Sequence, residues 1–399
     1  MILMPRSIIP PRSEPLRAAE SVTDVHPVRA SLAMTARFGI GGRMTERDAI
    51  SPSPSAGVAA ANQWDAEGDH ERAVDVLAAA SNTGDIEAMT RLGKRLLTAD
   101  RAPYLPDQGT ELIVKSANLG GAEAAAQLAV LAAIGMHMPQ SWATAMAAIV
   151  FSAERGSRAA QGQLRVLAAD RTLASAAAEV LLWRRLADGI DLNRWHSKAP
   201  AAVTLNGSPL VRRFPQFATV AMCRWLIDSS RNRLVRAPIY DAVAKTEAVS
   251  STRTNTWAQF NVTHADLVSV LAQVHICANT GVAFRQLEPL AVLHYDTGEQ
   301  STEHFDFIDP LIPDYADEVA RKGERIVTFL LYLNDDYDGG ETDLVTLGLK
   351  HKGGCGDGFY FVNALEDGRP DRRTLHAGRP PTRGEKWVVS QFIRNRATF

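Results

Sequence analysis

The stretch EHFDFI, residues 303–308, alternates polar and aromatic side chains at its centre, as a half-buried β-strand does. Side chains two positions apart in a strand point to the same face, so His304 and Asp306 would project together. An imidazole and a carboxylate side by side can form a surface ion pair, a general acid–base couple or part of a metal site. The stretch by itself leaves these three interpretations open.

Further β-rich runs surround this stretch, and turns containing Gly or Asp separate them. They are LEPLAVLHY (287–295), RIVTFLLYLN (325–334), FYFV (359–362) and KWVVSQFI (386–393). Apolar residues at helical spacing predict two helices before them, over 216–233 and 263–280, the second with Thr263 as its N-cap. Two helices followed by many short strands predict an antiparallel barrel or jelly roll supported by helices, a fold whose mouth can take a ligand.

The first half of the chain repeats itself with a period of 36 residues. Three residue types recur at this step: Gly84, Gly120 and Gly156, then Ala88, Ala124 and Ala160, then Leu92, Leu128 and Leu164. The glycines suit the left-handed residue that ends a helix, and a period of this length predicts a solenoid of helical hairpins. With NLGG at 118–121 followed by AxxxL, the pattern resembles the Sel1-like branch of the tetratricopeptide family. Such a solenoid either offers a groove to a protein partner or braces the domain that follows.

The composition indicates a folded chain without a strong charge. The 399 residues are 46% hydrophobic and carry a net charge of −2, which excludes a disordered or fibrous chain and a globally basic protein that would attract nucleic acid or a membrane. No uninterrupted apolar run approaches the roughly 18 residues of a membrane span. The three cysteines are scattered, without a disulfide framework or the CxxC spacing of a zinc site. We therefore expect a cytoplasmic protein.

These changes in sequence character divide the chain into four parts. We expect a disordered leader rich in Pro, Ser and Arg over 1–58, helical repeats over 59–170, a connecting segment over 171–208 and a strand-rich domain over 209–399. The predicted fold class is therefore α+β and multidomain, with an α-helical solenoid ahead of the strand-rich domain.

Two residues near the C-terminal end extend the pair of His304 and Asp306. They are His376 in TLHAGRPP and Lys386 in GEKWVVSQF. Two histidines and one carboxylate can occupy one face of an octahedral metal ion and leave three positions open, the arrangement of non-haem Fe(II) oxygenases. The ammonium of Lys386, at the start of a predicted strand, would meet the distal carboxylate of a cosubstrate in a charge-assisted hydrogen bond.

Three motifs make the resemblance to a known family specific. They are YDTGEQSTEHFDF (295–307), RIVTFLLYLNDDYDGGET (325–342) and TLHAGRPPTRGEKWVVSQFIR (374–394). In this order they resemble the catalytic domain of prolyl 4-hydroxylases, members of the 2-oxoglutarate- and Fe(II)-dependent dioxygenases. The resemblance includes the RTN of 253–255, where the family often has Arg-Thr-Ser, and covers about 209–396.

The resemblance implies a double-stranded β-helix (jelly-roll) dioxygenase domain. Such an enzyme hydroxylates a C–H bond with O2 and 2-oxoglutarate and releases succinate and CO2, and family members also use L-ascorbate to rescue uncoupled iron. The resemblance also implies the site residues: His304, Asp306 and His376 as catalytic Fe(II) ligands, Lys386 as the anchor of the far carboxylate of 2-oxoglutarate, and Tyr295 and Thr328 as further contacts of this cosubstrate.

Three functions from different classes remain open. The first is hydroxylation of prolyl residues in a peptide or protein, which the repeats would present. The second is hydroxylation of a free amino acid or other small molecule; Ser301 favours it, because the family usually has an aromatic residue there that takes part in peptide binding. The third is a Sel1-like protein-binding module with an inactive barrel, against which the intact ligand set argues.

Other conspicuous residues have plainer interpretations. We expect His294 and His351 to be solvent-facing or packing residues without a metal role. GGET at 339–342 predicts a hairpin turn and not a phosphate cradle, because no helix start follows it. The three cysteines, Cys223, Cys277 and Cys355, are expected to be small core residues.

Overall fold

The computed structural model describes residues 54–168, 179–199, 201–241, 246–248, 251–308 and 313–399. Residues 54–399 form one compact unit. The leader expected over 1–58 falls outside the described residues as far as Ser53, and helix α1 (Ala56–Ala66) already includes its last positions. In the described part of the chain, no helix is both long enough and apolar enough to cross a membrane.

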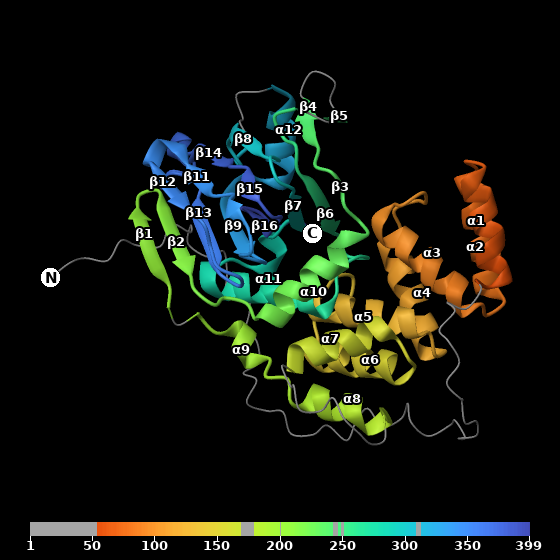
Figure 1. Ribbon diagram of the computed structural model, residues 1–399. Coiled ribbons are helices and arrows are strands. Elements are labelled where there is room, and N and C mark those ends of the chain that lie inside the picture. The colour runs from red at the N-terminus through yellow and green to blue at the C-terminus, as the bar shows by residue number, and fades with distance from the viewer. Residues whose placement is uncertain (1–53, 169–178, 200, 242–245, 249–250, 309–312) are drawn as a thin grey trace. The chain divides into compact units, whose positions relative to one another are not determined.

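Helical hairpins make up the described chain as far as Ala168 (Figure 1, orange to yellow). After α1 the hairpins are α2 (His70–Asn82) with α3 (Ile86–Thr98), α4 (Pro106–Asn118) with α5 (Ala122–Ile134), and α6 (Trp142–Glu154) with α7 (Arg158–Ala168). Within this series the first helix of each hairpin begins 36 residues after that of the hairpin before it, and so does the second. The predicted solenoid of helical hairpins is confirmed.

The repeated glycines lie in the turns between the two helices of each hairpin. Their φ angles are 97° at Gly84, 105° at Gly120 and 84° at Gly156. This left-handed conformation carries little cost only for a residue without Cβ, so the 36-residue recurrence of glycine follows from the geometry of the turn.

The last two hairpins pack against the strand-rich domain. Gln127 and Gln163, which are one repeat apart, reach across to the N-terminal end of α11 (Leu267–Thr280). Nε2 of Gln127 donates to the carbonyl of Val262 at 2.9 Å, and the backbone N–H of Leu267 donates to Oε1 of Gln163 at 2.9 Å. One hydrophobic core also runs from these hairpins into the sheet. These repeats therefore brace the domain that follows, as one of the two interpretations of the solenoid expected.

Two helices lie between the repeats and the sheet. Thr219 caps α10 (Val220–Arg231) by accepting a hydrogen bond from the N–H of Met222. The expected N-cap of α11, Thr263, is wrong: the cap is Asp266, which exchanges hydrogen bonds with Ser269 in a capping box. The sequence offers two cap-type residues three positions apart, and the reciprocal contact with Ser269 favours the second.

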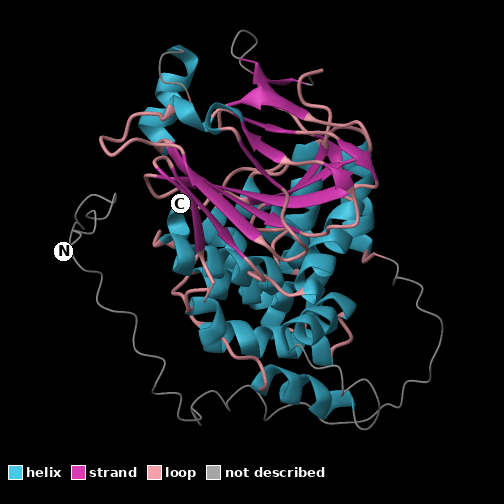
Figure 2. Ribbon diagram, turned by 60° about the vertical axis from the view of Figure 1, so that its left-hand side comes forward, coloured by secondary structure: helices cyan, strands magenta, loops and turns pink. Residues whose placement is uncertain are grey.

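The strand-rich domain contains two larger antiparallel sheets, which Figure 2 shows above the helices. The eight-stranded sheet runs in the order β1 (Val203–Gly207), β2 (Leu210–Phe214), β13 (Gly358–Val362), β9 (Arg325–Tyr332), β16 (Lys386–Arg394), β7 (Leu290–Tyr295), β6 (Thr256–Phe260) and β3 (Val235–Arg236). The four-stranded sheet runs in the order β12 (Leu349–His351), β11 (Thr342–Leu344), β14 (His376–Gly378) and β8 (Ser301–His304). This architecture fits the predicted jelly roll supported by helices.

Shorter elements complete the described chain. They are α8 (Glu179–Asp188), α9 (Asn193–His196), α12 (Pro313–Lys322), the strand pairs β4 (Ile239–Asp241) with β5 (Thr246–Ala248) and β10 (Asp338–Gly339) with β15 (Pro381–Arg383), and the 3-10 turns Phe284–Gln286, Val345–Leu347 and Arg372–Thr374. Strand β1 lies within 171–208, so part of the segment expected to connect the two halves belongs to the large sheet.

Two local predictions need correction. The strand predicted over 303–308 ends at His304, and Asp306 lies in the bend that follows, because β8 pairs with β14 only as far as His304. GGET forms a turn but not a hairpin, since the strands on its two sides, β10 and β11, belong to different sheets. Gly339 and Gly340 have φ angles of 68° and 70°, which turn the chain from one sheet to the other.

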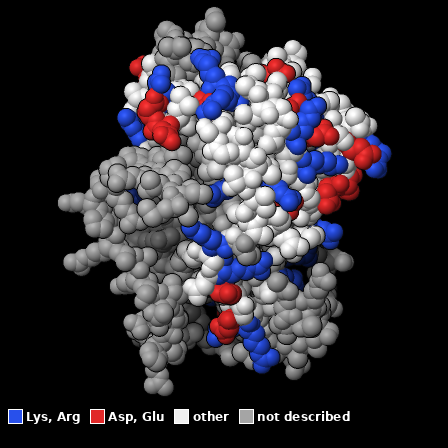
Figure 3. Space-filling view, turned by 90° about the vertical axis from the view of Figure 1, so that its left-hand side faces the viewer, with Lys and Arg blue, Asp and Glu red and all other residues white. Residues whose placement is uncertain are grey.

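Charged residues of both signs share the surface. The described part of the face in Figure 3 mixes Lys and Arg with Asp and Glu, as the net charge of −2 leads one to expect.

Candidate metal centre

The small sheet brings two predicted metal ligands together. His304 is the last residue of β8 and His376 the first of β14, and the two lie directly opposite each other in the antiparallel pair. Their ring centroids are 4.3 Å apart. The bend after β8 turns Asp306 back toward both rings, with Oδ1 at 3.5 Å from Nε2 of His304 and Oδ2 at 3.3 Å from Nε2 of His376. One donor atom from each residue lies within 4.8 Å of the others.

Backbone carbonyls orient both imidazoles. Nδ1 of His304 lies 2.7 Å from the carbonyl of Thr302, and Nδ1 of His376 lies 3.0 Å from the carbonyl of Thr374. A carbonyl can only accept, so Nδ1 is the protonated nitrogen in each ring and donates to it. Nε2 of each neutral ring therefore keeps its lone pair for a metal ion.

A buried chain of hydrogen bonds orients the carboxylate. Oγ1 of Thr328 donates to Oδ2 of Asp306 at 2.7 Å, and Nδ2 of Asn363 donates to Oγ1 of Thr328 at 2.9 Å. Thr328, on β9, was expected to contact 2-oxoglutarate. The structure places its hydroxyl on the carboxylate of Asp306 instead, and a direct contact with the cosubstrate stays a prediction.

Mutual charges shift the pKa values of these three groups. Burial by itself would raise the pKa of Asp306, but the neighbouring charge of His376 and hydrogen bonds from both imidazoles hold it well below its usual range. Burial opposes the charge of His376, whereas Asp306 outweighs it and raises the pKa. Burial and the charge of His376 lower the pKa of His304. The centre therefore presents an ionised carboxylate beside a readily deprotonated imidazole, a donor set ready for a cation.

The centre is closed on one side and open on the other. The side chains of Asp306 and His376 are 6% and 8% exposed, whereas that of His304 is 38% exposed. A metal ion held by these three residues would therefore face solvent beside His304, where a substrate has access.

Strand β16 begins with a buried cation. Lys386, the first residue of β16 and the strand partner of Tyr295 on β7, is 2% exposed. Its Nζ donates to the carbonyl of Gly340 at 2.8 Å and lies 5.3 Å from the ring centroid of Tyr295. Burial lowers the pKa of Lys386 to about 8, against the opposing charge of Glu341. An ammonium buried in this way is a strong binding site for an anionic group.

Two residues with hydroxyl groups, Tyr332 and Thr342, were not predicted from the sequence. The ring centroid of Tyr332 lies 5.6 Å from Nζ of Lys386, and its hydroxyl lies 2.9 Å from Oγ1 of Thr342. Thr342 is buried on β11, the strand next to the one that carries His376. Its position in GGET was the available signal, but we interpreted that stretch only as a turn.

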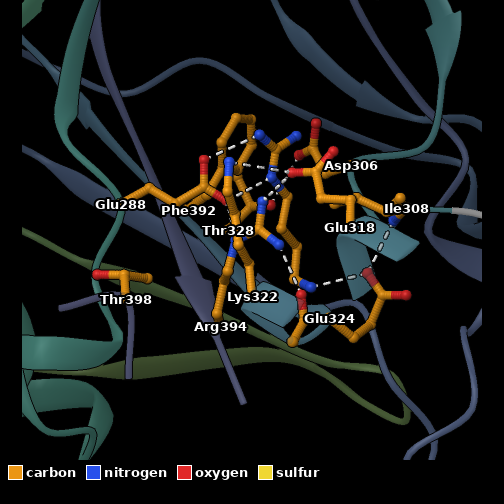
Figure 4. A network of polar contacts seen from close by, with 12 residues as sticks. Glu288, Asp306, Ile308, Glu318, Lys322, Glu324, Thr328, Phe392, Arg394 and Thr398 are labelled. Carbon is orange, nitrogen blue, oxygen red and sulfur yellow. Dashed lines mark hydrogen bonds and ion pairs between the residues drawn. The ribbon is translucent and has the colours of Figure 1, made fainter. Parts of the chain in front are cut away.

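Four charged residues tie the ends of central strands of the large sheet to α12; Figure 4 labels Glu288, Glu318 and Arg394 among them. The guanidinium of Arg325 contacts both carboxylate oxygens of Glu288 at 2.7 and 2.8 Å. Arg394 contacts Glu288 at 2.6 Å and Glu318 of α12 at 2.8 Å. Burial opposes the charge of Arg325, yet the charge of Glu288 raises its pKa, and Asp306 adds to this effect. This cluster joins the start of β9 and the end of β16 to each other and to α12.

The two remaining histidines that we considered have other partners. Nε2 of His294 lies 2.9 Å from Glu385, and its Nδ1 lies 3.1 Å from Oγ1 of Thr256. His351 stacks on Phe359 with ring centroids 4.5 Å apart. His294 also lies in a second group of possible donors with Asp296 and Glu299, whose donor atoms lie within 4.8 Å of one another, so its lack of a metal role stays a prediction.

Ser301 lies close to the centre. It is buried, and its Oγ is 3.4 Å from Nδ1 of His304. The position beside the most exposed ligand therefore carries a small polar side chain, in place of the aromatic one that the resemblance leads one to expect.

Comparison with known proteins identifies the domain that holds this centre. Residues 290–394 match the family model described as the 2OG-Fe(II) oxygenase superfamily, and they include all six predicted site residues. Prolyl 4-hydroxylase 13 of Arabidopsis thaliana is 29% identical over 208 residues, which are 48% of this chain and 73% of that protein. Prolyl 4-hydroxylase subunit alpha-1 of Rattus norvegicus is 29% identical over 195 residues, 47% of this chain and 35% of that protein.

Two kinds of solved structure are similar to parts of the chain. The viral collagen prolyl hydroxylase of Paramecium Bursaria Chlorella virus-1, in its 2OG complex, is 24% identical over 46% of this chain and 95% of its own, with a TM-score of 0.36. A Sel1 repeat protein from Oxalobacter formigenes is 18% identical over 32% of this chain and 53% of its own, with a TM-score of 0.24.

Proposed function

We propose that this chain, whose residues 290–394 are a 2OG-Fe(II) oxygenase domain, hydroxylates prolyl residues of a peptide or protein. The observation that carries the proposal is the convergence of two imidazole nitrogens and one carboxylate, in a domain that also carries a buried ammonium on β16. The relatives named above are prolyl 4-hydroxylases, which supports a prolyl substrate.

The donor set fits Fe(II). Two neutral imidazoles and one carboxylate leave open positions on a divalent ion, as oxygenase chemistry requires. His304, Asp306 and His376 would hold the ion, and the carbonyls behind both imidazoles set the tautomers that metal binding needs.

The cation of Lys386 fits the far carboxylate of 2-oxoglutarate. Among the described residues, its hydrogen bond goes to the backbone carbonyl of Gly340 and not to a carboxylate, so the ammonium can still receive an anion. The phenol of Tyr295 and the hydroxyl of Thr342 lie on strands adjacent to those of Lys386 and His376, respectively, and would add hydrogen bonds. Burial keeps Tyr295 protonated by raising its pKa to about 12, so it donates.

When bound, Fe(II) and 2-oxoglutarate supply the activation of O2 and the oxidation of a C–H bond, with succinate and CO2 as coproducts. The protein's own residues bind and orient. Thr328 fixes the carboxylate of Asp306, and Lys386 fixes the direction in which the cosubstrate enters. The apolar walls around Tyr295 and Phe361 exclude water from the interior of the site.

Two accompanying proposals concern the reductant and the compartment. L-Ascorbate would keep the metal reduced after uncoupled turnover, and the exposure of His304 supports access for a small reductant. A cytoplasmic location is supported by the free thiols of Cys223, Cys277 and Cys355, which a reducing compartment preserves.

A small-molecule substrate is the second candidate. It is favoured by Ser301, because the space beside His304 lacks the aromatic side chain that would contact a peptide. A free amino acid would fit such a site without help from the repeats.

The repeats would present a protein substrate from the hairpins that do not brace the catalytic domain. Because α5 and α7 contact that domain, deletion of residues 1–170 would damage both functions at once. Surface substitutions on α1 and α2 separate the two roles better.

The test is a turnover assay with Fe(II), 2-oxoglutarate and ascorbate that measures succinate and substrate mass. Proline-rich peptides should gain one oxygen, with succinate in equal amount, and Asp306→Ala should abolish both. Turnover of free amino acids without peptides would support the second candidate. If neither peptides nor free amino acids gain an oxygen while succinate still forms, both candidates are contradicted. If a folded, metal-loaded protein forms no succinate at all, a binding module with an inactive barrel is favoured.

A further inference from the structure

Two cysteines that are far apart in the sequence meet at the end of β9. Cys223 lies in the first turn of α10 and is fully buried, whereas Cys355 lies in the loop between β12 and β13 and is partly exposed. Their side chains both reach the end of β9, and each thiol shifts the pKa of the other. Sγ of Cys223 also lies 3.9 Å from the carbonyl of Tyr332, and Sγ of Cys355 lies 3.2 Å from the carbonyl of Leu333, the next residue.

The backbone around this thiol pair is held in place. The N–H of Gly356 donates to the carbonyl of Tyr332 at 2.8 Å, and the N–H of Ala218 donates to the carbonyl of Gly356 at 3.0 Å. The N–H of Cys355 donates to Oδ2 of Asp335 at 3.1 Å. One hydrogen bond therefore joins the loop to the residue before the N-cap of α10, and two more join it to residues at and just after the end of β9.

The two thiols differ in the way that disulfide exchange requires. Contact with the thiol of Cys223 lowers the pKa of Cys355, which is the sulfur nearer to solvent. The same contact, together with burial, raises the pKa of Cys223. Cys355 is therefore the attacking thiolate, and Cys223 is the resolving thiol behind it. Cys277 on α11 is a natural control, since burial raises its pKa to about 12.

We propose that Cys223 and Cys355 form a redox-active pair that a disulfide oxidant such as glutathione disulfide converts to an intramolecular disulfide. The thiolate of Cys355 attacks one sulfur of glutathione disulfide, so that the S–S bond of glutathione breaks and one glutathione thiolate leaves. The sulfur of Cys223 loses its proton to solvent and attacks Sγ of Cys355, which displaces the second glutathione. The protein loses two electrons and two protons, and glutathione disulfide is reduced to two glutathione molecules.

The bond would tie α10 to the loop before β13. α10 packs on α7 of the repeats and on β6 and β7 of the large sheet, so the disulfide would lock the helix that lies between the two halves. The segment between Cys223 and Cys355 contains His304 and Asp306. Closing so long a loop should stabilise the fold of the domain.

The test is titration of the full chain with a series of reduced and oxidised glutathione ratios, followed by alkylation, intact mass and peptide mapping. The expected product has lost two hydrogens, contains a peptide joining Cys223 to Cys355, and has a thermal unfolding midpoint higher by roughly 5 °C or more. Reduction should reverse all three changes. Cys277→Ser should behave as the wild type.

Two results would overturn the proposal. One is a stable mixed disulfide of glutathione on Cys355 in the wild type without the cross-link, because the resolving step would then be absent. The other is an unmodified protein at every glutathione ratio. Cys223→Ser provides the reference mass spectrum for this outcome, since the reaction of this variant with glutathione disulfide should stop at the mixed disulfide on Cys355. If that variant fails to fold, the wild-type peptide map still decides the question.

Discussion

The hydroxyl of Thr328 donates a 2.7 Å hydrogen bond to Oδ2 of Asp306, and the amide of Asn363 supports it from behind at 2.9 Å. Thr328 and Asn363 are almost completely buried. A carboxylate between two imidazoles can rotate, and this chain of donors fixes its orientation relative to the two Nε2 atoms. The geometry of the centre therefore depends on residues that do not touch the metal.

Thr328→Val should weaken metal binding by about tenfold, the lower end of the effect usual for such outer contacts. The substitution keeps the shape of the side chain and removes its donor. Anaerobic titration with Fe(II), or with Mn(II) followed by electron paramagnetic resonance, measures the change. Thr328→Ser, which retains the hydroxyl, should bind like the wild type. Equal affinity of the valine variant would show that Asp306 needs no orientation by Thr328.

Lys386→Met should raise the Kd for 2-oxoglutarate on the order of 100-fold, because a buried anion would lose its partner charge. Metal affinity without the cosubstrate should stay unchanged, which separates this effect from unfolding. Calorimetry with the metal-loaded protein measures both. Lys350→Met on exposed β12 is the matched control. An unchanged Kd for 2-oxoglutarate in Lys386→Met would contradict the proposed anchor.

The affinity for 2-oxoglutarate should fall as the pH rises above 8. The pKa of Lys386 without ligand is about 8, and binding of a carboxylate should raise it. Above pH 8, Lys386 must therefore take up a proton when 2-oxoglutarate binds. The Kd for 2-oxoglutarate should increase there by up to about tenfold per pH unit, and it should stay nearly constant below pH 7. Lys386→Arg does not titrate in this range, so its Kd should stay flat between pH 8 and 9.5. A flat wild-type profile would mean that the ammonium has no part in binding.

Gln163→Leu should lower the free energy of unfolding by about 1–3 kcal/mol, because it leaves the first N–H of α11 buried without an acceptor. Urea unfolding of the full chain measures this loss. Gln161→Leu is the control: its amide bonds to the carbonyl of Ala153 within the repeat, at a half-buried position, and its loss should cost less. Equal stability of Gln163→Leu and the wild type would show that the repeats do not brace the domain through this contact.

Much of the fold followed from periodicity in the sequence. A glycine every 36 residues predicted the hairpins because the turn that ends a helix takes a left-handed residue, which glycine adopts at the least cost. The β-rich runs predicted strands of the large sheet because they are short and largely apolar, and the structure buries both faces of β7 and most of β9. The short strand β14 carries the weaker signal HAG, and its existence depends on pairing with β8 and β11.

The sequence predicted the site residues whose role follows from the chemistry of their own side chain. It did not predict the roles that depend on contacts between residues. His304, Asp306, His376 and Lys386 stand in motifs, and the structure brings the first three together. Thr328 was assigned to the cosubstrate because its sequence neighbourhood does not show that its hydroxyl faces Asp306 across the barrel. No feature of the sequence marked Asn363 as a site residue. Its hydrogen bond to Thr328 depends on the pairing of β13, which ends just before it, with β9.

The most direct test of the central claim is anaerobic titration of the full chain with Fe(II) and then 2-oxoglutarate, followed by visible spectroscopy. We predict a weak metal-to-ligand charge-transfer band in the wild type that is lost in Asp306→Ala and kept in Glu303→Ala, a change at an exposed position of the same strand as His304. In Lys386→Met the band should require far more 2-oxoglutarate. A folded, iron-loaded wild-type protein that shows no band, or a band that survives in Asp306→Ala, would contradict the assignment of this centre.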